Sequence, residues 1–166
     1  ERSRGLGDVY KRQLLKFSLL FFSLNSFCGN TIFDDSLDEF TDERTLQLGV
    51  FADDSNSVTP KLIGISCKKG GEPRMLLQPG FMFSTESELT VTYRFEKNEP
   101  DKQVFSYLSN ANRSLLYTNN KGFIQRFLDD LRISDNLILK IEGSSEIIRF
   151  RDLTESKTNV SKFVNA

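Results

Sequence analysis

The 166-residue sequence contains neither histidine nor tryptophan. Histidine is the commonest metal ligand in proteins and the side chain that most readily exchanges protons near neutral pH. Its absence excludes the Ser-His-Asp and Cys-His catalytic triads and the usual zinc sites. Catalysis by Asp, Glu, Lys or Tyr remains open. We expect no bound metal and no cofactor.

The sequence also has no apolar run of the roughly 20 residues that a transmembrane helix requires. Its most apolar stretch, residues 14–28, places Lys16 before a short apolar core that ends near the small residues Ser26 and Cys28. This layout is typical of a secretory signal peptide. We therefore predict a signal peptide over residues 14–28 and a periplasmic or otherwise exported protein. The alternative, a buried core helix, fits less well because a polar, acidic stretch follows.

The first thirteen residues include no initiator methionine. Residues 3–13 resemble the in-frame translation of a transposon-type sequencing adapter, and the match is uninterrupted. We therefore expect residues 1–13 to be a non-native segment and exclude them from the fold prediction. A native basic N-terminus is the alternative.

Cysteine is scarce, with one residue at position 28 and one at position 67. A lipoprotein signal needs a small residue just before the cysteine, and Phe27 occupies that place. Membrane contact is therefore expected only through the signal peptide, or through a disfavoured lipid on Cys28. Cys67 is the single cysteine of the predicted mature part. A leftover cysteine in an exported protein indicates either a missing disulfide partner or a free thiol, and both remain open here.

Neither sign of charge dominates the chain. It carries 22 Lys+Arg against 23 Asp+Glu, and residues 1–28 contribute more of the former than of the latter. The predicted mature part is therefore mildly acidic. Its composition has neither the excess of basic residues expected of a nucleic-acid-binding protein nor a polybasic segment for binding an anionic membrane. Its length suits one domain with a real hydrophobic core.

Residues 29–43 are polar and rich in carboxylates. We predict a solvated lead-in before the domain, because the spacing lacks the glycine and the terminal glutamate of an EF-hand calcium loop. The carboxylates are Asp34, Asp35, Asp38, Glu39, Asp42 and Glu43.

Short segments with a two-residue alternation of apolar and polar side chains follow. The clearest is 88–96, where Leu89, Val91, Tyr93 and Phe95 share one face. Thr90, Thr92 and Arg94 share the opposite face, as in a sheet with one solvent-exposed face. Further strands are predicted over 45–52, 62–68, 74–77, 136–141 and 146–150, with weaker patterns over 104–108 and 114–117.

Two helices interrupt this pattern. Three- and four-residue spacing from Gly122 predicts one helix whose apolar stripe comprises Phe123, Ile124, Phe127, Leu128 and Leu131. Val160, Phe163 and Val164 predict a second helix that starts near Ser156. Many short strands with turns between them favour a mostly-β fold, an antiparallel sandwich or small barrel with one or two packed helices. We expect a single β-rich domain over residues 44–166 that is truncated at its C-terminus.

Several local patterns carry a family resemblance over about 125 residues. They are the apolar strand 61–67 ending in Cys67, the segment 91–96, the helix from Phe123 to Leu131, the segment 150–154 with its following helix, and the acidic segment 40–43. With these, the chain resembles the small periplasmic accessory proteins of type VI secretion, the VasI/TagO type. It departs from that family in having no tryptophan, since aromatic residues are frequent near the start of the family's mature domain.

The resemblance implies a disulfide for Cys67. Proteins of that type usually end their last helix with a cysteine that could bond the strand cysteine, and this chain ends at Ala166, about where that cysteine would follow. The resemblance therefore implies a partner beyond Ala166, while a buried free thiol remains the alternative.

These observations together predict a non-enzymatic accessory or binding protein of the bacterial cell envelope. Its partner would be another protein or cell-wall material, and Thr90, Thr92 and Arg94 form a candidate interaction face, with an ordinary solvated face as the alternative. A second hypothesis is a carboxylate-dependent envelope hydrolase using Asp129 and Asp130 or Asp152 and Glu155. A third is a structural domain of a larger exported protein.

Overall fold

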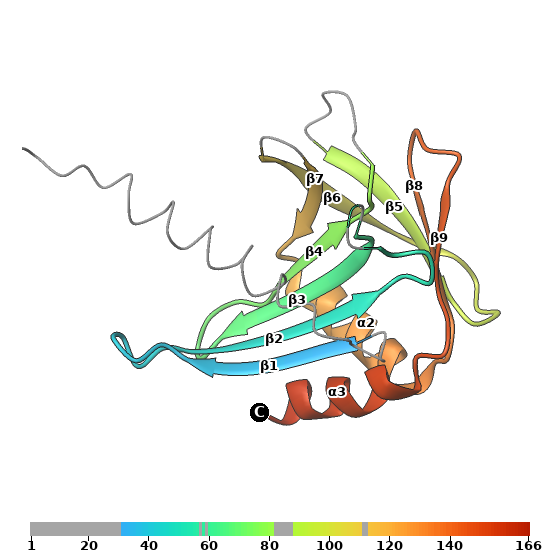
Figure 1. Ribbon diagram of the computed structural model, residues 1–166. Coiled ribbons are helices and arrows are strands. Elements are labelled where there is room, and N and C mark those ends of the chain that lie inside the picture. The colour runs from blue at the N-terminus through green and yellow to red at the C-terminus, as the bar shows by residue number, and fades with distance from the viewer. Residues whose placement is uncertain (1–30, 57, 59, 82–87, 111–112) are drawn as a thin grey trace, which may run out of the picture.

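The computed structural model describes residues 31–56, 58, 60–81, 88–110 and 113–166. The predicted adapter segment and signal peptide lie outside these residues. Within these residues, nine antiparallel strands form one sheet in the order β1-β2-β3-β4-β7-β6-β5-β8-β9, accompanied by two helices. The mostly-β prediction is confirmed, and the sheet does not close into a barrel (Figure 1). The elements are β1 Thr31–Leu37, β2 Arg44–Phe51, β3 Leu62–Lys68, β4 Arg74–Gln78, β5 Glu88–Phe95, β6 Asp101–Asn110, β7 Arg113–Thr118, α2 Lys121–Ile133, β8 Leu137–Ile141, β9 Ile147–Phe150 and α3 Thr154–Asn165.

Strand β1 corrects the sequence prediction for residues 29–43. This segment was expected to be a solvated lead-in, yet Thr31–Leu37 pairs with β2 along its whole length, from Thr31↔Val50 to Leu37↔Arg44. The sheet therefore starts before residue 44. The polar composition concealed the strand because β1 lies at an edge of the sheet, where charged side chains are favoured since they discourage pairing with other chains.

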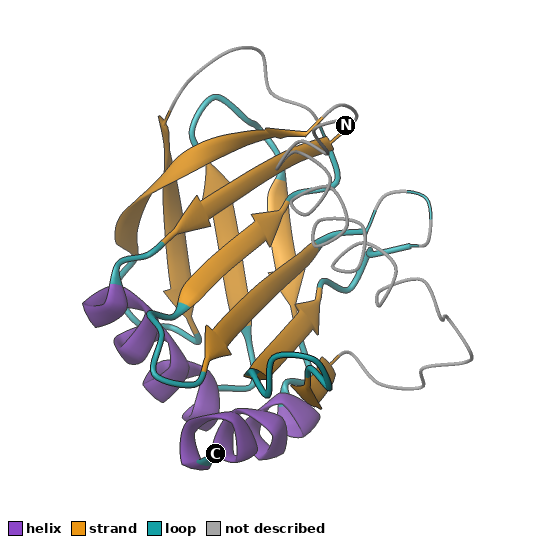
Figure 2. Cartoon of the chain, turned by 90° about the vertical axis from the view of Figure 1, so that its left-hand side faces the viewer, coloured by secondary structure: helices purple, strands orange, loops and turns teal. Residues whose placement is uncertain are grey.

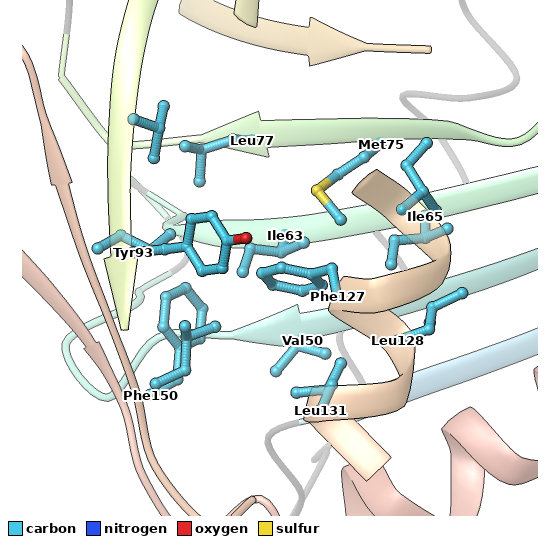
Figure 3. Close-up of a cluster of buried hydrophobic side chains, with 14 of the residues drawn as sticks. Val50, Ile63, Ile65, Met75, Leu77, Tyr93, Phe127, Leu128, Leu131 and Phe150 are labelled. Atoms are coloured by element: carbon cyan, nitrogen blue, oxygen red, sulfur yellow. The ribbon is translucent and has the colours of Figure 1, made fainter. Parts of the chain in front are cut away.

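The interior is one apolar cluster shared by both halves of the sheet. The predicted inward residues of β5 are all buried, and so is the whole predicted stripe of α2. Figure 3 shows Phe127 of α2 close to Tyr93 of β5 and Ile63 of β3. The ring centroids of Tyr93 and Phe127 are 5.8 Å apart, within the range of favourable aromatic pairs. The sheet therefore bends around α2.

Both predicted helices are present, and they gather at one end of the sheet (Figure 2). Helix α2 begins after Asn120, whose side chain accepts a hydrogen bond from the Phe123 amide at 3.1 Å. Helix α3 buries Val160 and Phe163, whereas Val164, also expected on the apolar stripe, is 40% exposed. Among the described residues, neither helix is long and apolar enough to cross a bilayer.

The two ends of the sheet approach each other without pairing as strands. The Asp53 amide, just after β2, donates to the Arg149 carbonyl of β9 at 2.9 Å. Lys61 is buried at this junction and forms ion pairs with Asp54 and Glu146. Burial alone would lower the pKa of Lys61, but the hydrogen bonds to these two carboxylates outweigh it and raise the pKa. This junction holds the bent sheet in place.

Candidate functional site: a cationic sheet face

The three residues predicted as an interaction face do lie together. Thr90, Thr92 and Arg94 project from β5 on the side of the sheet that points away from the core, and each is partly buried. Strand β5 sits between β6 and β8. Its outward residues therefore have neighbours on both sides, and these neighbours decide the chemistry of the face.

The rows of the sheet that contain Thr92 and Arg94 carry further cations. Thr92 lies opposite Lys102 of β6 on one side and Lys140 of β8 on the other. In the next row, Arg94 lies opposite Ile138, which in turn lies opposite Arg149 of β9. With strands spaced at 4.7–4.9 Å, the backbones of Lys102 and Lys140 are about 10 Å apart. We call the four residues Arg94, Lys102, Lys140 and Arg149 the cationic face.

The cations of this face are not paired with a carboxylate of any described residue. Within the part of the chain that the structure describes, none of the four forms an ion pair, and the ion pairs present lie elsewhere. The Nε atom of Arg94 is buried and has no hydrogen-bond acceptor among the residues that the structure describes. Buried polar groups in native proteins are nearly always hydrogen-bonded, so an exception invites an explanation such as an unseen ion or ligand.

Two carboxylates, those of Glu142 and Glu88, border the face on the side of Thr90. Glu142 follows β8, and hydrogen bonds from Thr90 lower its pKa, with a smaller contribution from the charge of Lys102. Glu88 is exposed at the start of β5. The rows through Thr92 and Arg94 therefore remain positive. Two exposed apolar side chains, Val104 at 48% and Ile147 at 39%, lie beside the cations.

The structure does not assemble the residues of the hydrolase hypothesis into a pocket. Asp129 is half-exposed and lies 3.8 Å from Arg132 on the same helix, and Asp152 and Glu155 are exposed near the start of α3. An interior cavity of about 10 Å³ is lined only by apolar residues and Tyr93, and is about large enough for one water molecule. No group of three potential metal ligands occurs among the described residues.

Tyr93 is the one ionisable side chain at this cavity. Its hydroxyl donates to Asp101 at 2.8 Å. Burial, helped by this carboxylate, raises the pKa of Tyr93 far above its ordinary value. Tyr93 therefore stays protonated near neutral pH, which suits a core residue better than a general base.

Cys67 is half-buried on the core side of β3, opposite Leu46. It forms no disulfide, and its Sγ lies 3.4 Å from the Lys68 carbonyl oxygen. The Ala166 carbonyl accepts a hydrogen bond from Arg44, which is two residues before Leu46 on β2. The end of α3 thus reaches the strand next to Cys67. The predicted partner beyond Ala166 stays a prediction.

Sequence reasoning found Arg94 but missed the other three cations. Lys102 precedes the weak segment predicted at 104–108, while Lys140 and Arg149 lie on the predicted strands 136–141 and 146–150, which no local pattern joins to the strand 88–96. Two-residue alternation within 136–141 and 146–150 would have placed them on outward faces. Only the pairing of β5 with both β6 and β8 brings them together.

We compared the chain with family models, curated proteins and solved structures, and no match was found in any of the three comparisons.

Proposed function

We propose that this chain is a non-enzymatic accessory or binding protein of the cell envelope that holds an acidic partner on its cationic face. The observation that carries the proposal is the arrangement of four cations around Thr92 without any ion pair among the described residues. The Nε of Arg94, which has no hydrogen-bond acceptor among the described residues, lies in the same row of the sheet as Arg149.

The cationic face is expected to attract an acidic partner for an electrostatic reason. Like charges on neighbouring strands repel one another, so an anion placed between them gains attraction and also relieves that repulsion. Arg94 and Arg149 can each bind a carboxylate through two parallel hydrogen bonds. Val104 and Ile147 add apolar contact at the margin of the face. An acidic protein segment fits this mixture best, and an anionic cell-wall polymer is the alternative partner.

The proposal also includes export from the cytoplasm and an association with type VI secretion. Export rests on the signal-like segment 14–28, and an association with type VI secretion rests on the resemblance described above. A structural role within a larger exported protein is the competing function. Fractionation of bacteria that express the chain tests the compartment: recovery outside the cytoplasm supports export, and retention of the folded chain in the cytosol contradicts it.

Binding of a fluorescent poly-glutamate peptide by the full chain tests the role of the face. We expect binding that weakens as salt is added, because exposed charges are screened within about 10 Å at 0.1 M salt. Replacing the two lysines that flank Thr92, in the variant Lys102→Glu/Lys140→Glu, should weaken binding roughly tenfold or more.

The matched control is Lys121→Glu/Lys162→Glu. It makes the same change in net charge at two exposed lysines on α2 and α3, outside the face. The control should bind as the unaltered chain does. Equal weakening by both variants would mean that net charge rather than the face attracts the peptide, and the proposal would then be wrong. Replacing the peptide with isolated cell-wall sacculi distinguishes the two kinds of partner.

A further inference from the structure

The turn between β1 and β2 exposes an unusual amount of apolar surface. Phe40 is 95% exposed and Leu37 is 60% exposed. Phe40 is thus a large aromatic side chain held almost wholly in water, although aromatic residues are more often found in cores or at interfaces. We call residues 37–43 the hairpin tip.

The tip is also acidic. Glu39 and Asp42 are exposed and form no ion pair with another described residue, and Glu43 pairs only with the exposed Lys68. The tip therefore combines an apolar anchor with negative charge. The cationic face carries positive charge and has the exposed side chains of Val104 and Ile147 at its margin. The two surfaces are complementary in both respects.

The tip and the face of one molecule lie far apart. In Figure 1 the β1–β2 turn projects from one side of the sheet, while β5, β8 and β9 stand at the opposite side. A contact between tip and face must therefore join two molecules.

We infer that the hairpin tip of one copy docks on the cationic face of a second copy, with Phe40 beside Ile147 and with Glu39 and Asp42 near Lys102 and Lys140. This inference rests on the proposed function, because it names a second copy as the acidic partner of the face. The interface is head-to-tail, so each added copy still presents a free tip or a free face. A hairpin tip covers less than the ~800 Å² per partner of a standard interface, so the contact is weak.

Sedimentation velocity of the full chain over a range of concentrations tests this inference. The average mass should rise with protein concentration at low salt and fall as salt is added. The tip variant Phe40→Ser and the face variant Lys102→Glu/Lys140→Glu should each remain monomeric when alone.

The decisive sample is an equal mixture of these two variants. The tip variant retains an intact face, and the face variant retains an intact tip, so one contact can form between them. The mixture should yield a dimer that grows no further, because the remaining tip and face are both altered. A mixture that stays monomeric would overturn the inference, as would an unaltered chain that stays monomeric at every concentration.

Matched controls separate the contact from general surface effects. Ile133→Ser removes a 72% exposed apolar side chain at the end of α2, and Lys121→Glu/Lys162→Glu changes the charge outside the face. Both controls should associate as the unaltered chain does. Every variant keeps the same residues 1–30, so association through those residues would not respond to these substitutions.

The poly-glutamate binding assay distinguishes a failure of this inference from a failure of the proposed function. If the chain never self-associates but its face variant still loses poly-glutamate binding, the face is an anion-binding surface and only the second-copy inference is wrong. If the face variant binds poly-glutamate normally, the proposed function itself is wrong.

Discussion

The β1–β2 hairpin at one edge of the sheet and the outward face of the strands at the other edge carry opposite charge. At one end, the β1–β2 hairpin over residues 31–51 has six Asp+Glu and a single Arg. At the other, β6, β5, β8 and β9 turn four cations outward. The hairpin is therefore acidic and the outward face of these four strands is mainly cationic, although the composition of the whole chain is nearly neutral.

The ends also differ in how their charges are satisfied. In the hairpin, Arg44 binds both oxygens of Asp35, at 2.7 and 2.6 Å, and Lys68 pairs with Glu43. On the cationic face no such pair exists among the described residues. Charges that are already paired within the chain, such as those of Arg44 and Asp35, gain little electrostatic energy from a ligand, whereas the unpaired cations of the face gain more. This difference supports the proposal that an acidic partner binds on the face.

Two phenylalanines give the largest expected contrast in stability. Phe127→Ala should destabilise the protein by about 3–5 kcal/mol, because its buried ring packs between the halves of the sheet and truncation leaves a cavity. Phe40→Ala should change stability by less than about 0.5 kcal/mol, since that ring is in water.

Urea denaturation monitored by circular dichroism measures both variants. Because the two ends share one core, Phe127→Ala should shift the whole transition rather than split it in two. A comparable loss from Phe40→Ala would show that the tip packs inside the protein, and it would remove the basis for treating the tip as a docking element.

A smaller effect concerns the acid sensitivity of the two ends. Glu96, just after β5, accepts hydrogen bonds from the amides of Asp135 and Asn136, and these bonds lower its pKa. A carboxylate whose pKa is lowered in the folded state stabilises the protein above its unfolded pKa, and this contribution disappears as the pH falls through the folded pKa. The stability advantage over Glu96→Gln should therefore shrink as the pH drops below about 4.5.

Asp35 supplies the contrasting case at the hairpin end. Its pKa is lowered mainly by the hydrogen bond from Arg44, with the charge of Arg44 adding to it. Its contribution to stability, compared with Asp35→Asn, should also be lost in acid but should decrease further as salt is added. Urea midpoints measured from pH 7 to pH 3, at low and high salt, test both residues. An equal salt response at Glu96 and Asp35 would contradict this difference between amide and guanidinium donors.

Much of the fold could be predicted because it depends on local periodicity. The alternation from Leu89 to Phe95 and the stripe from Phe123 to Leu131 both record which side of an element faces the core. Strand β1 could not be predicted this way, because an edge strand with Asp34, Asp35 and Ser36 buries too few apolar side chains to produce a pattern.

The candidate site could be predicted only in part. Periodicity placed Thr90, Thr92 and Arg94 on one side of β5, since that requires only the alternation within one strand. It could not join them to Lys102, Lys140 and Arg149, because which strands are neighbours depends on long-range pairing. Similarly, the exposure of Phe40 was not evident, because an aromatic residue in sequence gives no sign of whether it faces the core or water.

The sequence by itself determined the mostly-β class, the inward face of each well-patterned element and the two helices, because burial of apolar surface imposes a period of two or of 3.6 residues on the chain. The tertiary structure alone decided the strand order, the bending of the sheet around α2 and the separation of charge between its ends. These properties arise from contacts between residues far apart in sequence, and no local pattern encodes which strand becomes whose neighbour.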